Sequence, residues 1–169
     1  MVVTKEELIG SLQNEVRILL HLASKIDPEK LGYRPSPKQR SMLELLQYLT
    51  VMGPALIQQI KIGTFDLVAF RTAEAEAANL SIDAALAKIR SHSIDYANLL
   101  SSLTEAEFRG EVEMFGRRAT RGAMIVNMVL CGCAAYRMQL FLYLKAVGRE
   151  ELGTMDLWAG MDGPKQATA

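Results

Sequence analysis

The stretch LGYRPSPKQRSMLELLQYL, residues 31–49, contains a proline-rich connection followed directly by an apolar helical pattern. Proline has no backbone N–H and crowds the preceding turn, so residues 27–40 are not expected to form a helix. From about Lys38, apolar residues recur at helical spacing as far as Ile60, and Gly63 follows as a stop. This pattern predicts a long helix with a kink or break at Gly53-Pro54.

Three more helices are predicted around this one. Thr4 and Glu7 have the capping-box spacing, and the first helix that they open ends before Asp27. The third begins at Asn79 or Ser81 and extends through Leu100, and the fourth covers about 120–147 and ends at Gly148. We expect a connection with some helical character over 64–80, a short helical turn from Thr104, and an extended or irregular stretch over 110–119. No convincing alternating strand is found.

Composition excludes several classes of protein. The 169 residues fit one domain, and 19 Lys+Arg balance 19 Asp+Glu, which argues against binding to nucleic acid or an anionic membrane. Two cysteines, Cys131 and Cys133, exclude a disulfide scaffold. The N-terminal residues lack the basic and apolar regions of a secretory signal, so a cytoplasmic protein is expected.

The fourth predicted helix is apolar almost all round. Between Arg121 and Arg137 it has no charged residue, and residues 123–144 are long enough to span a bilayer. Asn127, Arg137 and Gln139 count against insertion. We therefore expect no membrane span but a helix buried on two sides, by its own bundle and by a second subunit. This predicts a homodimer through helix 120–147.

A search for chemical motifs gives few candidates. There is no Glu-x-x-His or His-x-x-x-His metal motif, and the only histidines, His21 and His92, lie on different helices. His21 is expected to be solvated and His92 to be a half-buried structural residue. Cys131 and Cys133 are two residues apart and point in different directions, so they are interpreted as small core residues.

One acidic residue and one group of arginines are further candidates. Glu15 falls inside the apolar stripe of the first helix and must be paired, protonated or able to reach solvent. Arg117, Arg118 and Arg121 flank the start of the fourth helix, where they could bind a phosphate or carboxylate; a solvated loop is the alternative.

Residues 31–49 resemble the loop and second helix of the DinB-like proteins, which read Leu-x-x-Arg-Pro-x-Pro, Arg-Ser and Glu-x-Leu-x-His-Leu. YRMQLFLYLKAVG (136–148) is similar to that family's His-Arg-x-Gln-Leu-x-x-Tyr-Leu-x-x-x-Gly, and DLWAGMD (156–162) also resembles its tail. The resemblance implies an all-α, up-and-down four-helix bundle over 1–148, usually dimeric. A C-terminal tail, 149–169, is expected to pack on it and to fray at its end, from Gly163.

The resemblance also implies a divalent metal such as zinc or nickel, held by three histidines. Their positions correspond here to Tyr48, Gly132 and Tyr136, none of which is histidine. A neutral phenol is a poor ligand for these metals, so no metal cofactor is expected. The hypothesis is that Tyr48 and Tyr136 occupy the metal cavity, with their hydroxyls bonded to each other, a water or Glu15. The alternative is two tyrosines that only fill space.

Two functions remain open from the sequence. The chain is a DinB-like protein without metal chemistry, which binds a small ligand or acts through its dimer interface. Alternatively, it is a thiol-dependent transferase or isomerase of the DinB-like superfamily, in which the tyrosines and the arginines 117, 118 and 121 orient an anionic cosubstrate. The candidate pocket residues are Tyr48, Tyr136, Gly132, Glu15 and His92.

Overall fold

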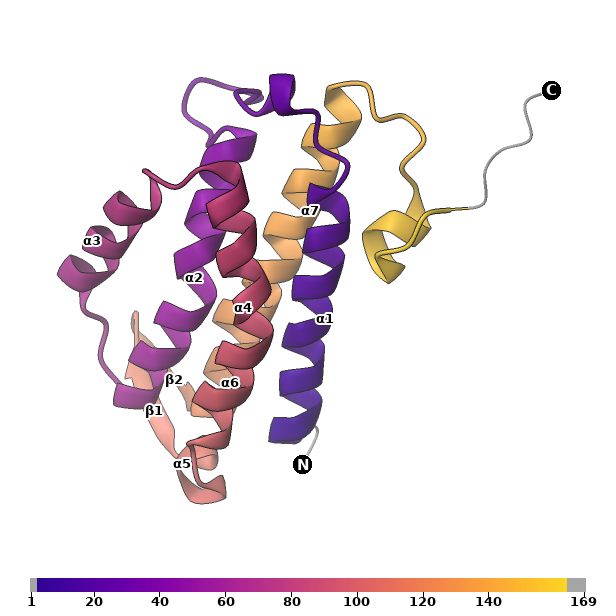
Figure 1. The fold of residues 1–169 in the computed structure, drawn as a ribbon. Helices are drawn as coiled ribbons and strands as arrows, with labels where there is room; N and C mark the ends of the chain where they lie inside the picture. Colours follow the sequence, from indigo (N-terminus) through magenta and orange to yellow (C-terminus); the bar gives the residue numbers. More distant parts are fainter. Residues whose placement is uncertain (1–2, 164–169) are drawn as a thin grey trace.

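The computed structural model describes residues 3–163, and its long helices stand side by side in a bundle (Figure 1). They are α1 (Lys5–Ala23), α2 (Met42–Ile62), α4 (Ile82–Ser101) and a last helix that ends in α7 (Cys131–Ala146). α4 packs against α1 and α2, and α7 also packs against α1 and α2. The prediction of an all-α, up-and-down four-helix bundle is confirmed.

Capping residues decide where these helices begin. Thr4 caps α1 through the predicted box with Glu7, and Ser41 caps α2 through an equivalent box with Glu44. The predicted start of α2 near Lys38 is therefore wrong. A turn in which the N–H of Gln39 donates to the carbonyl of Ser36 precedes the cap instead.

α2 continues through Pro54 without the predicted break, and a side chain of α4 contacts the carbonyl that Pro54 leaves without its helical donor. Pro54 cannot donate to the carbonyl of Thr50, and Nε2 of His92 lies 3.2 Å from that oxygen. At Gly53, a Cβ would lie 2.0 Å from the hydroxyl oxygen of Tyr96, so no larger residue fits there without a shift. The Gly53-Pro54 pair thus marks where α4 docks on α2.

Two segments between the long helices are more regular than expected. α3 (Leu67–Ala77) occupies most of the connection, and α5 (Glu105–Arg109) follows the predicted cap at Thr104. β1 (Glu111–Met114) and β2 (Arg117–Thr120) then form an antiparallel hairpin, so the absence of a strand was wrongly predicted. The hairpin turns at Phe115 and Gly116, both with positive φ, which is the pattern of a type I′ turn.

The predicted fourth helix is continuous but not uniformly α-helical. It consists of α6 (Arg121–Ile125), a π-helical turn (Val126–Leu130) and α7. The helix Arg121–Ala146 has 26 residues, and its most apolar 18-residue stretch has a mean hydropathy of 1.5, so by length and composition alone it could cross a membrane. In its most apolar stretch only 22% of the residues are buried within the chain. Many apolar residues of this helix are therefore not fully buried within the chain.

The C-terminal segment folds back onto α1 and α7. A π-helical turn, Met155–Ala159, is held by Arg17, whose Nη1 donates to the carbonyls of Ala159 and Gly160 at 2.8 and 3.2 Å. His21 is half-buried under this segment, with Nε2 2.9 Å from Oδ1 of Asp156, so its expected solvated position is wrong. Most of the end expected to fray, residues 164–169, lies outside the described residues.

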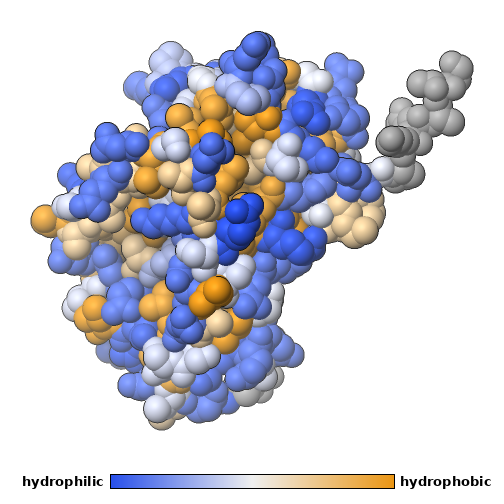
Figure 2. All heavy atoms as spheres, in the orientation of Figure 1, coloured by the Kyte–Doolittle hydropathy of each residue, from blue (hydrophilic) through white to orange (hydrophobic). Residues whose placement is uncertain are grey.

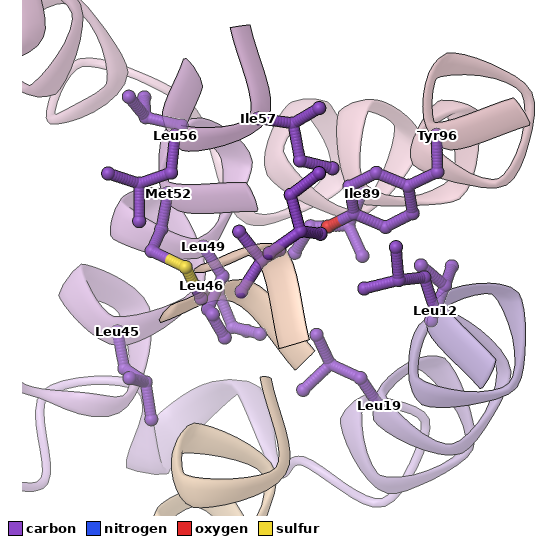
Figure 3. Close-up of a cluster of buried hydrophobic side chains, with 14 of the residues drawn as sticks. Leu12, Leu19, Leu45, Leu46, Leu49, Met52, Leu56, Ile57, Ile89 and Tyr96 are labelled. Carbon is purple, nitrogen blue, oxygen red and sulfur yellow. The ribbon is translucent and has the colours of Figure 1, made fainter. Parts of the chain in front are cut away.

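The core lies between the four long helices. Figure 3 shows that its labelled side chains converge from α1, α2 and α4, with the Tyr96 ring pointing into the cluster. On the outside, hydrophilic residues cover much of the face in Figure 2, with hydrophobic residues among them.

Candidate functional site

Tyr48 and Tyr136, the first two candidate residues, meet between α2 and α7. Their ring centroids lie 5.3 Å apart at 68°, an edge-to-face arrangement, and both residues are half-buried. The ring centroid of Phe70, on α3, lies 6.5 Å from that of Tyr48, also in an edge-to-face arrangement. The guanidinium carbon of Arg40 lies 3.8 Å from the centroid of the Tyr48 ring. Arg40 also pairs with Glu74 at 3.2 Å. We call these five residues the tyrosine cluster.

Burial keeps the Tyr48 phenol protonated. Burial raises the pKa of Tyr48 well above 10. The neighbouring Tyr136 hydroxyl raises this pKa further, whereas the positive charge of Arg40 lowers it. The guanidinium over the ring contributes positive charge here, but it faces the π-electrons and not a phenolate.

Gly132, the third candidate, faces the side chain of Met52. A Cβ built on Gly132 would lie 3.3 Å from Cε and 3.6 Å from Sδ of Met52, which is itself buried. A histidine at this position would need Met52 to move. The space beside Gly132 is therefore filled by α2.

The three aligned residues do not fit a divalent metal. They supply two phenols, one of which is held protonated, and no third side chain, whereas zinc and nickel bind imidazole, thiolate or carboxylate. In residues 3–163, His, Cys, Asp and Glu gather in a group of three only at His21, Asp156 and Asp162, outside this cluster.

Glu15, the fourth candidate, lies on the other side of α7 and pairs with Arg137 in place of the tyrosines. Nε of Arg137 is 2.8 Å from Oε2 of Glu15, with side chains 6% and 12% exposed. These two atoms are close, but their geometry does not meet the criteria of a hydrogen bond. Arg137 Nη1 also donates to the carbonyl of Leu157. The guanidinium carbon of Arg137 lies 5.2 Å from the centroid of the Trp158 ring. Burial raises the pKa of Glu15, and Arg137 opposes that shift.

His92, the fifth candidate, completes a second buried group that we call the polar core: Glu15, Arg137, His92, Tyr96 and Cys133. Four of these residues, all but Arg137, line an internal cavity of about 10 Å³, room for one water at most. Burial lowers the pKa of His92 to about 4 and raises that of Cys133 to about 11. At neutral pH the imidazole and the thiol are therefore uncharged, and no substrate fits beside them. His92 is more deeply buried than the sequence predicted.

The three arginines do not converge on one point. Arg117 and Arg118 are exposed on β2, where Nε of Arg118 lies 3.9 and 3.8 Å from the carboxylates of Glu111 and Glu113. Arg121 points elsewhere: its Nε donates to the carbonyl of Lys61 at 3.2 Å and its Nη1 to that of Glu107 at 3.3 Å. It thereby binds carbonyls at the ends of α2 and α5.

The sequence did not indicate a further hollow near these elements. A hollow of about 380 Å³ lies between α1, α5 and α6. Its lining includes Leu8, Phe108, Gly122, Ala123 and Val126, with Thr120 and Asn127 as polar members and Arg109 as a charged one. Small or apolar residues far apart in sequence form most of it, so no motif marked it. Its size is that of a small-molecule pocket.

Comparisons with known proteins identify the fold of this chain. No protein-family model matches the chain, and no curated protein sequence matches it. The crystal structure of a DinB-like protein, YjoA, from Bacillus subtilis superposes with a TM-score of 0.65. It covers 86% of this chain and 94% of its own chain, at 20% sequence identity. The likeness shows the fold: this chain is a helical bundle of the DinB-like type.

Proposed function

We propose that this chain is a DinB-like protein that works without the three-histidine metal site of that family. The observation that supports this most strongly is the filling of the aligned positions. Tyr48 packs on Tyr136 beneath Arg40, and Met52 fills the space beside Gly132. A protein whose ligand positions are packed in this way has no room there for a cation and its water ligands.

We further propose that the chain acts through the outward face of the π-helical turn and α7, as a homodimer. This face has a row of apolar residues that are exposed or half-buried. They are spaced alternately three and four residues apart: Met128, Cys131, Ala135, Met138 and Leu142. Met138 is 38% and Leu142 56% exposed. This is the spacing of a helix–helix seam, and a two-fold axis would bring the same seam of a second copy against it.

Small-molecule binding is the second part of the proposal, and the 380 Å³ hollow is the place for it. Its lining favours a compact, mainly apolar ligand. The balanced charge of 19 basic and 19 acidic residues supports a protein that binds neither nucleic acid nor membrane. The free thiols of Cys131 and Cys133 fit a reducing, cytoplasmic compartment.

A thiol-dependent transferase or isomerase is the weaker candidate. It would need the arginines and the tyrosines to face a common cosubstrate. Arg121 is instead engaged with two backbone carbonyls, and Arg118 lies near two glutamates of the hairpin. This placement gives the alternative no support.

Sedimentation velocity at micromolar concentration tests the dimer. The wild-type chain is expected to sediment as a dimer, and Met138→Asp with Leu142→Asp as a folded monomer, because the added charges face a second copy. Ile94→Asp is the matched control, since Ile94 is 66% exposed on α4, away from the seam. A monomeric wild type, or a dimer that survives both charges, would contradict the proposal.

A further inference from the structure

Three potential metal ligands from distant parts of the chain meet at the C-terminal end of α1. They are Nε2 of His21 and one carboxylate oxygen each of Asp156 and Asp162, all within 4.8 Å of one another. His21 Nε2 lies 2.9 Å from Asp156 Oδ1 and 3.9 Å from Asp162 Oδ1. Ligand atoms around a tetrahedral zinc ion lie about 3.4 Å apart, so the measured distances fall on either side of the required value.

The carboxylate of Asp156 is held in position and lacks a permanent cation among its described contacts. Asp156 is 3% exposed, and its Oδ2 accepts a hydrogen bond from the N–H of Gly153 at 2.9 Å. Its other contact is the His21 imidazole, which is positive only when protonated. A buried carboxylate is stable when a positive charge accompanies it, and a second contact that orients a ligand is typical of metal sites.

The backbone brings Asp162 to the same point. Gly160 has a φ of +55° and lies so close to α1 that a Cβ would be 3.0 Å from Cα of Ile18. This close turn, with Arg17 bound to the carbonyls of Ala159 and Gly160, directs the chain back toward His21. The third ligand therefore depends on the fold of the tail and not on a sequence motif.

We propose that His21, Asp156 and Asp162 bind a divalent transition-metal cation, zinc above others, which clamps the C-terminal segment to α1. One imidazole and two carboxylates form a three-ligand set with a further position for water. The ion would take the place of the imidazole–carboxylate hydrogen bond and neutralise the two acids. The site is separate from the tyrosine cluster, so it neither requires nor replaces the metal-free function proposed above.

Lys25 is the competitor for this cation. Its ammonium contacts Oδ1 of Asp162, whose side chain is 75% exposed. A cation must displace this ammonium to use the same oxygen. Removal of the Lys25 charge should therefore increase the affinity for the metal. If the three residues only hold the tail in place and bind no metal, the affinity should not increase.

Calorimetric titration of zinc into tag-free, chelator-treated protein tests the proposal. The expected result is one ion per chain, with affinity reduced at least about tenfold in His21→Gln and in Asp156→Asn and increased in Lys25→Gln. Asp83→Asn, at an exposed position on α4, is the matched control and should leave the affinity unchanged. Trp158, the only tryptophan, lies in the clamped segment, and its fluorescence gives a second readout.

Any one of three results would overturn the site. The first is wild-type protein that binds no zinc, and the second is equal affinity in the wild type and His21→Gln. Weaker binding in Lys25→Gln would also contradict it, because the ammonium would then help binding. The oligomeric mass is measured separately, so the zinc site and the proposed dimer can fail independently.

Discussion

Adjacent residues of α7 point into two different interiors. Tyr136 enters the tyrosine cluster, which is half-buried and whose only ion pair, Arg40 with Glu74, lies at its exposed rim. Arg137 enters the polar core, where its pair with Glu15 is almost completely buried. The first interior is packed with neutral rings, and the second holds charge away from water.

The fold should be most sensitive to substitution where charge is buried. A solvent-exposed ion pair contributes about 0–1 kcal/mol, because water screens it. A buried pair contributes little net stability when intact, but its loss leaves one charge without a partner in a region of low polarity. Substitutions on the two sides of α7 should therefore have very different costs.

Arg137→Ala should have the largest effect. It leaves Glu15 buried without a partner and removes the bond to the carbonyl of Leu157, so the free energy of unfolding should fall by about 3–5 kcal/mol in urea titrations. Arg118→Ala, at a residue whose side chain is 69% exposed, is the control and should change it by less than about 0.5 kcal/mol. Equal effects of the two substitutions would remove the contrast between the interiors.

His92 should make the polar core sensitive to acid. Its pKa is about 4 in the folded chain and 6.5 when unperturbed, so the unfolded chain binds the proton more readily. The stability due to neutral His92 is complete above pH 6.5 and is lost as the pH falls toward 4, by about 3 kcal/mol. The raised pKa of Glu15 acts in the opposite sense, reducing stability as pH rises above 4.5.

His92→Gln isolates this contribution, because an amide can still donate to the carbonyl of Thr50. Urea titrations between pH 7 and pH 4 should show a smaller loss of stability in the variant than in the wild type. An unchanged pH dependence would mean that His92 is not the buried group that titrates.

Tyr136→Phe should have the smallest effect. It removes only a hydroxyl from a half-buried ring and keeps the edge-to-face contact with Tyr48, so thermal unfolding should report a change below about 1 kcal/mol. A loss above about 2 kcal/mol would show that the hydroxyl anchors a polar network, and the cluster would then resemble the polar core.

The helices could be predicted from the sequence because their determinants are local. The Thr4 cap, the stop at Gly63 and the apolar periodicity act within a few residues. The hairpin was missed because each strand has four residues, and the π-helical turn was missed because no residue type requires it. These features arise from packing between distant segments.

The site was only partly predictable for the same reason. The meeting of Tyr48 with Tyr136 follows from helix geometry and the family resemblance, and the structure brings them together. The partner of Glu15 could not be inferred, since Arg137 was interpreted only as a residue unfavourable in a membrane. His21 was misplaced because its partner, Asp156, lies 135 residues away along the chain.

We propose that the tyrosine cluster leaves no metal site in the bundle, and titration of the His21→Gln variant with nickel or zinc is the decisive experiment. In this variant the proposed clamp at the tail is weakened at least about tenfold, so only a tightly bound equivalent would report on the bundle. We expect no tightly bound ion at one equivalent per chain. One tightly bound equivalent that disappears in Tyr48→Phe with Tyr136→Phe would contradict it.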